Sequence, residues 1–253
     1  MRASNPVLNE STFESEAQFT TGPGHMTLGG AVMKTAALVI ILLTTGALAW
    51  TQLAASMAEG GTRPGWFMLA LIGSSIGGFI VAMITSFAPK ASPFTAPLYA
   101  ALEGVFLGLF SNLFEGMYAG IVLQAVALTI SVLVCLLFLY ATRVIVVTEK
   151  LKLGIVAATG AIALVYLASI VLSFFGVNIP YIHGSGLIGI GFSLFVVGIA
   201  AMNLVLDFDF IEQGTRRPTP KYMEWYAGFG LLVTLVWLYL EILKLLAKLR
   251  NRD

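Results

Sequence analysis

Residues 120–141 read GIVLQAVALTISVLVCLLFLYA, a run that contains no Asp, Glu, Lys or Arg. A helix of about 20 mostly apolar residues is long enough to cross the hydrocarbon core of a bilayer. The run also lacks the alternation of polar and apolar residues that a membrane β-strand shows. It is therefore predicted to form a membrane-spanning helix.

Six further runs of the same kind lie along the chain, three before and three after this one, separated by short connections rich in Gly, Pro and charged residues. The predicted spans are Ala36–Met57, Trp66–Phe87, Ala96–Phe114, Gly120–Ala141, Leu153–Phe175, Gly186–Phe210 and Trp225–Leu246. The predicted fold class is all-α, a polytopic membrane protein with about seven transmembrane helices. Residues 1–35 are predicted to be a polar, mobile cytoplasmic tail, and residues 36–253 a single transmembrane domain.

Composition supports a lipid environment and excludes several classes of function. Hydrophobic residues make up 58% of the chain and charged residues only 11%, against about 25% charged in soluble domains. The net charge of +1 provides no basic surface for nucleic acid. A single cysteine, Cys135, provides neither a disulfide nor a thiol-based metal site. The lipid bilayer is the expected partner, and no tightly bound cofactor is expected.

The distribution of basic residues predicts the orientation, because cytoplasmic connections are rich in Lys and Arg. One set of connections carries Lys90, Arg143, Lys150, Lys152, Arg216, Arg217 and Lys221, whereas the opposite set carries only Arg63. The N-terminus is therefore predicted to be cytoplasmic, in a multi-pass protein of the plasma membrane. The C-terminal tail is also basic, although seven crossings would place it outside. Either the last segment crosses against the rule, or it re-enters and returns.

Four acidic residues lie within or beside the predicted spans: Glu103, Asp207, Asp209 and Glu241. A charged side chain at the centre of a span costs about 2.5–3.5 kcal/mol on insertion scales, so each acid needs a structural or functional reason. Asn203 precedes Asp207 by four residues and shares its helical face.

Three of the four acids also have an interpretation without function. Asp209 points away from Asp207 and lies nearer the aqueous end, as a solvated helix-end charge would. Glu241 precedes Lys244 by three residues, so the two could pair near the membrane face. Glu103 could form a structural hydrogen bond between helices.

The functional interpretation brings Asp207 and Glu241 together. Two carboxylates in a bundle of low dielectric constant cannot both ionise cheaply, so they share a proton at low pH. Deprotonated, they offer hard oxygen ligands suited to calcium. The two align in depth only if the seventh helix begins in water around Lys221–Trp225 or is displaced along its axis. No catalytic motif is present, so an enzyme is not expected.

Three stretches resemble the Bax inhibitor-1 (TMBIM) family, in its bacterial YccA-like branch. They are Leu102-Glu103-Gly104 with Gly108, Leu206-Asp207-Phe208 followed by Ile211-Glu212-Gln213, and Leu238-Tyr239-Leu240-Glu241-Ile242-Leu243. Ser4-Asn5-Pro6-Val7 is similar to the opening of many bacterial members. Two features depart from the family pattern: a glutamate replaces the usual aspartate at position 241, and the connection between the two acids is longer.

The resemblance implies a helical fold in which a central last helix is surrounded by two groups of three. It also implies a pH-sensing acidic pair, here Asp207 and Glu241, that controls a calcium leak. Glu103, Asn203 and Asp209 are accessory polar groups of the expected pathway, and calcium or protons would be the permeant partners. The alternative is a non-conducting regulatory protein that binds another membrane protein, such as a quality-control protease, through its polar N-terminal tail.

Overall fold

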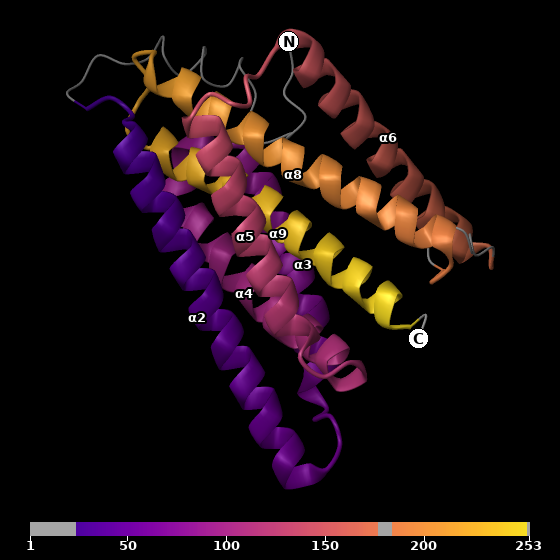
Figure 1. The fold of residues 1–253 in the computed structure, drawn as a ribbon. Coiled ribbons are helices and arrows are strands. Elements are labelled where there is room, and N and C mark those ends of the chain that lie inside the picture. The colour runs from indigo at the N-terminus through magenta and orange to yellow at the C-terminus, as the bar shows by residue number, and fades with distance from the viewer. Residues whose placement is uncertain (1–23, 177–183, 252–253) are drawn as a thin grey trace. The chain divides into compact units, whose positions relative to one another are not determined.

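The computed structural model describes residues 24–176 and 184–251. Within these ranges, seven helices are long and apolar enough to cross a membrane, which confirms the predicted all-α fold class. They are α2 (Leu28–Gly60), α3 (Trp66–Phe87), α4 (Ser92–Met117), α5 (Ile121–Ala141), α6 (Glu149–Phe174), α8 (Leu187–Thr215) and α9 (Met223–Arg250), with a short 3₁₀ helix η1 (Pro89–Ala91) before α4 (Figure 1).

Most helices extend beyond the predicted spans, and α3 alone has the predicted bounds. Helix α2 begins at Leu28 instead of Ala36, so residues 28–35 are helical and do not belong to a tail. Residues Glu115-Gly116 and Glu149–Lys152, predicted as turns, lie in α4 and α6. Hydropathy marks only the part of a helix in the hydrocarbon core, whereas the helix continues through the polar interface. Residues 1–23 lie outside the described residues.

Side chains define several helix ends. Thr27 is the N-cap of α2, and its hydroxyl accepts a hydrogen bond from Gly30 N. Thr148 caps α6 in the same way by accepting from Leu151 N. Gly61 ends α2 in the left-handed conformation (φ 66°), which glycine adopts without a steric penalty. These caps satisfy backbone groups that a helix end leaves without partners.

The helices form two compact units. One, the α5–α6–α8 unit, holds α5, α6, α8 up to Phe210 and α9 from Val233. The other, the α2–α3–α4 unit, holds α2, α3, α4, the end of α8 from Ile211 and α9 up to Leu232. Each unit thus contains three other helices and one part of α9, residues 223–232 in one unit and 233–250 in the other, as the two-group architecture requires. The single transmembrane domain stays a prediction.

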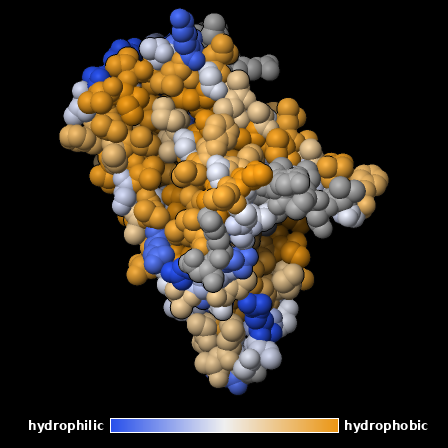
Figure 2. Space-filling view, turned by 45° about the vertical axis from the view of Figure 1, so that its right-hand side comes forward, coloured by the Kyte–Doolittle hydropathy of each residue, from blue (hydrophilic) through white to orange (hydrophobic). Residues whose placement is uncertain are grey.

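Helix α9 is the most buried of the seven spans. In the most apolar 18-residue stretch of α9, 67% of the residues are buried, against 17–44% in the corresponding stretches of the other six helices. It runs without a break from Met223 to Arg250, so it does not turn back on itself as a re-entrant segment would. The outer faces of the other helices are apolar, and Figure 2 shows hydrophobic side chains over much of the visible surface.

Small residues bring α2 and α4 into close contact in the α2–α3–α4 unit (Figure 1). A Cβ atom on Gly108 would collide with the carbonyl oxygen of Gly46, and one on Gly104 with Thr45 and the carbonyl of Leu42. Such close backbone approach is typical of small-residue interfaces between membrane helices. These glycines therefore pack within the chain.

Candidate functional site

The polar face of α8 contains Asn203 and Asp207, each 2% exposed. Asn203 Nδ2 donates to Thr159 Oγ1 of α6 at 2.8 Å and to the carbonyl oxygen of Ile199 at 2.8 Å. Because the two residues are four apart, both side chains emerge on the same side of the helix. The sequence-based expectation that Asn203 and Asp207 share a face agrees with this arrangement.

Asp209 is half-buried, and its Oδ1 accepts a hydrogen bond from the hydroxyl of Tyr140 at 3.4 Å. The ring of Tyr140 also contacts Phe208, with centroids 5.9 Å apart. Asp209 thus contacts α5, so it is more than a solvated charge at the end of the helix.

Glu241 lies in the second half of α9 and is 1% exposed. Its Oε1 accepts from Lys244 Nζ at 3.0 Å, forming a salt bridge. Its Oε2 accepts from the hydroxyl of Tyr166 on α6 at 2.9 Å. Both carboxylate oxygens are therefore bound within the α5–α6–α8 unit. The pairing of Glu241 with Lys244, one of the two sequence-based interpretations, is present.

A further basic residue continues this polar face toward the end of α9. Lys248 Nζ donates to Ser193 Oγ at 2.8 Å and to the carbonyl oxygen of Gly189 at 3.1 Å, both on α8. Arg250 donates to the carbonyl of Ala119 at 2.7 Å. Glu241, Lys244 and Lys248 are spaced three and four residues apart, so they form one polar track along the helix.

Tyr166, which binds Glu241, also contacts Phe192 of α8, with ring centroids 6.3 Å apart. Lys248, seven residues after Glu241 on α9, donates to Ser193 of the same part of α8. The pairing of Asp207 with Glu241 stays a prediction.

Glu103 belongs to the α2–α3–α4 unit and is half-buried on α4. Its Oε2 lies against α3, where a Cβ on Gly78 would come within 3.1 Å of it. Tyr99 lies one turn earlier on the same helix, buried and in edge-to-face contact with Phe229 at 4.9 Å. Among the described residues, Glu103 has no hydrogen bond or ion pair. The expected interhelical hydrogen bond is therefore not seen in that part of the chain.

One buried acid was missed by the sequence analysis. Glu224, in the first turn of α9, is 2% exposed, and its Oε1 accepts from Thr27 N at 3.1 Å and from Thr27 Oγ1 at 3.0 Å. A Cβ on Gly30 would collide with the same carboxylate. The only sequence signal is the pair Gly29-Gly30 directly after a capping residue, which leaves room for an incoming group.

Among the described residues, no group of three or more His, Cys, Asp and Glu side chains is arranged to hold a metal ion. Calcium binding by Asp207 and Glu241 stays a prediction.

Comparison with known proteins places this membrane architecture in a family. The family model described as Bax inhibitor 1 like matches residues 5–251, nearly the whole chain. The chain belongs to the Bax inhibitor-1 family. No curated protein and no solved structure matches it.

The Bax inhibitor-1 assignment and the seven apolar helices together establish a multi-pass membrane protein of the TMBIM type. The three stretches that carry the resemblance lie in α4, α8 and α9. Two of them contain a buried acid of the α5–α6–α8 unit, and the third contains Glu103.

Proposed function

We propose that this Bax inhibitor-1 family protein provides a pH-dependent pathway for calcium across the plasma membrane. The observation that supports this most directly is the burial of two carboxylic acids, Asp207 and Glu241, in helices long enough to span a bilayer. Ionisable residues within spans are expensive, and they typically mark ion or proton pathways.

The chemistry of the acids accounts for both ion binding and pH dependence. An ionised carboxylate is a hard oxygen ligand that suits calcium. A protonated carboxyl has lost the charge that attracts a divalent cation. The pathway therefore conducts when the acids are ionised, and calcium flux falls as they become protonated.

The arrangement of contacts supports two stations in the pathway. Asp207 forms one, on the same face of α8 as Asn203. Asp209, two residues further on, accepts a hydrogen bond from Tyr140 of α5. Glu241 forms the other, beside Tyr166 and Lys244. The acidic pair of the family would then act through ion movement between stations, or would meet directly after α9 shifts along its axis. Glu103 is proposed as an accessory polar group, in the α2–α3–α4 unit.

The test is calcium flux into liposomes that contain the purified protein, measured from pH 5 to pH 8. We expect wild-type flux to rise with pH, because fewer carboxyls are protonated. Asp207→Asn keeps the shape of the side chain but cannot ionise, so its flux should be low and independent of pH. Glu59→Gln is the control, since Glu59 is an exposed acid at the end of α2. If the pH dependence of flux in Asp207→Asn matched that of wild type, Asp207 would not be part of the pathway.

Calcium flux no greater than that of empty liposomes at every pH would contradict the proposed calcium pathway. The alternative is a non-conducting protein that regulates another membrane protein, such as a quality-control protease, through its polar N-terminal residues. A deletion of residues 2–23 tests it, because this deletion keeps Thr27 and its contacts with Glu224. Loss of a co-purifying membrane partner without loss of flux would favour regulation as a separate activity.

In the regulatory model, Glu241→Gln and Asp207→Asn should leave partner binding unchanged. In the calcium model, the same substitutions should alter flux while the deletion does not. The two functions therefore predict opposite responses to the two kinds of change.

A further inference from the structure

The salt bridge at Glu241 places a basic side chain of the protein where a permeant cation would bind. Lys244 Nζ is 3.0 Å from Oε1, and Tyr166 donates to Oε2 from 2.9 Å. Lys244 Nζ also lies 5.2 Å from the centroid of the Tyr166 ring. The three side chains therefore form a closed cluster in which each contacts the other two.

The exposure of the two charged partners is very unequal. The side chain of Lys244 is 41% exposed, whereas that of Glu241 is 2% exposed. Helical side chains tilt toward the N-terminus of their helix, so Lys244 leans over Glu241 from the side of the helix end. The ammonium group thus covers a carboxylate that is otherwise buried.

We propose that Lys244 is a tethered cation that occupies Glu241 and must be displaced before calcium reaches that carboxylate. Tyr166 is a positioning residue, because its hydroxyl holds the second oxygen and its ring gives the displaced ammonium a nearby resting place. This inference rests on the proposed calcium pathway and adds the residue that competes with the permeant ion.

The side chain of lysine suits this role. It carries a compact point charge on a flexible stem, so it can leave the carboxylate by rotation about single bonds without movement of the helix. An arginine would bind the carboxylate through two parallel hydrogen bonds and leave less readily. Lys244 also lies within two turns of the end of α9 at Arg250, so a released ammonium group can reach the aqueous interface.

The decisive variant is Lys244→Gln, and its matched control is Arg250→Gln. Both remove one positive charge from the same helix, but Arg250 donates to the carbonyl oxygen of Ala119 and to Gln124 at the end of the helix. We expect Lys244→Gln to raise calcium flux at pH 7 about tenfold, the scale of one charge-assisted hydrogen bond. Arg250→Gln should change it less than twofold. Equal effects of the two variants would overturn the proposal.

Calcium binding provides a readout that does not need conduction. Calorimetric titration of the detergent-solubilised protein with calcium chloride should show about tenfold tighter calcium binding for Lys244→Gln than for wild type. The double variant Glu241→Gln/Lys244→Gln should lose this gain, since the carboxylate is absent. Unchanged affinity in Lys244→Gln would reject the tethered cation.

Further variants cover the remaining outcomes. If Lys244→Gln does not fold, Lys244→Arg provides the test. The arginine should bind Glu241 more tightly, so calcium flux should fall below that of wild type. Flux equal to that of wild type would contradict the proposal. Tyr166→Phe should raise flux by a smaller factor than Lys244→Gln. Wild-type flux with no response to Lys244 substitutions rejects this inference alone, whereas background flux in wild type and all variants rejects the calcium pathway itself.

Discussion

At the start of a helix the first backbone N–H groups have no partners within the helix. In α2 the backbone N–H of Gly30 donates to the hydroxyl of Thr27. The backbone N–H of Thr27 itself donates to the carboxylate of Glu224, which lies far away in the sequence. A negative charge at this end also interacts favourably with the helix dipole. Glu224 therefore ties the start of α9 to the start of α2 within the α2–α3–α4 unit, and its role is structural.

We expect Glu224→Ala to lower the free energy of unfolding by about 2 kcal/mol, since hydrogen bonds to charged groups contribute about 1.5–3 kcal/mol. Unfolding in detergent micelles, followed by circular dichroism, measures the change. Glu59→Ala is the control, because Glu59 is an exposed acid at the end of α2. Exposed substitutions of this kind usually change the free energy of unfolding by less than about 0.5 kcal/mol. Similar losses in both variants would contradict the capping role.

At the scale of elements, α2 and α4 pack through glycines whose missing side chains allow the backbones to touch. The alternative, a seam between two copies of the chain, would leave those glycines facing outward. Instead Gly104 and Gly108 face the backbone of α2 around Gly46. Packing of this kind depends on van der Waals contact, because lipid tails are as apolar as the helices and provide no hydrophobic drive.

Gly108→Ala should destabilise the protein by about 1–3 kcal/mol, the usual cost of overpacking. The added methyl group meets a carbonyl oxygen, which cannot rotate away. Gly116→Ala, on the same helix with open space around it, should be neutral or stabilising, since alanine favours helix by up to about 1 kcal/mol. Melting temperatures of the two variants in detergent give the comparison. A stable Gly108→Ala protein would show that α2 and α4 can separate without cost.

The sequence predicted the elements well and their long-range partners poorly. Apolar runs located all seven helices, and helical spacing placed Asn203 beside Asp207. Glu224 was missed because its partner Thr27 lies 197 residues away. Tyr166 was missed for a similar reason. A tyrosine within an apolar run is usually a packing residue, and its hydrogen-bond partner Glu241 lies 75 residues further along the chain. Helix ends were predicted too short, because polar first and last turns have no hydropathy signal.

At the scale of the whole molecule, the seven helices raise the question of which side each connection faces. The unbroken α9 favours an odd number of crossings and therefore termini on opposite sides. The basic residues at its end are bound: Lys244 by Glu241, Lys248 by Ser193 and Arg250 by a backbone carbonyl.

Labelling of single cysteines in a Cys135→Ser background tests this topology. We expect Arg63→Cys and Asn251→Cys to react with a membrane-impermeant thiol reagent in intact cells. Arg216→Cys should react only after permeabilisation, since its connection carries many of the basic residues. Labelling of Asn251→Cys only after permeabilisation would place both termini in the cytoplasm and contradict seven crossings.

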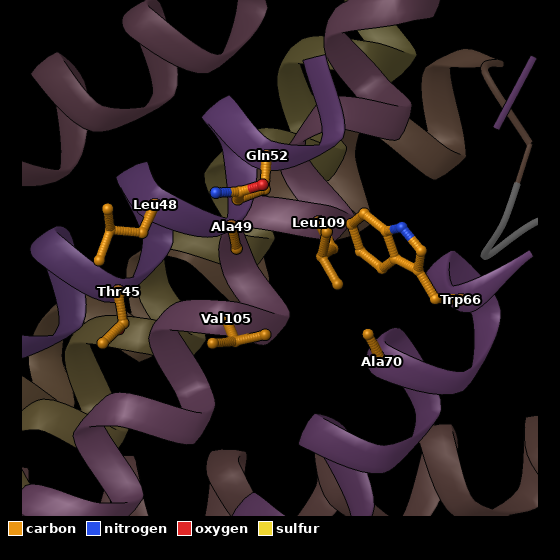
Figure 3. A pocket seen from close by; sticks show the side chains of 8 residues that line it. All are labelled: Thr45, Leu48, Ala49, Gln52, Trp66, Ala70, Val105 and Leu109. Carbon is orange, nitrogen blue, oxygen red and sulfur yellow. The ribbon is translucent and has the colours of Figure 1, made fainter. Parts of the chain in front are cut away.

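An additional feature of the α2–α3–α4 unit is a cavity of about 400 Å³ between its helices, lined by Thr45, Leu48, Ala49, Gln52, Trp66, Ala70, Val105 and Leu109 (Figure 3). Figure 3 shows Gln52 on α2 and Trp66 on α3 at its edge. Its lining is mostly apolar, which distinguishes it from the charged cluster around Glu241.

The division of α9 between the two units has a consequence for synthesis of the protein. Synthesis runs from the N-terminus, so the ribosome makes α9 after the six other spanning helices that the structure describes. Until Met223–Arg250 emerges, Thr27 lacks the Glu224 carboxylate, and Tyr166 lacks the Glu241 carboxylate. Each unit therefore lacks one of its polar contacts until this helix is in place. A chain that stops before α9 would leave the hydroxyl of Thr27 in one unit and that of Tyr166 in the other without their acidic acceptors.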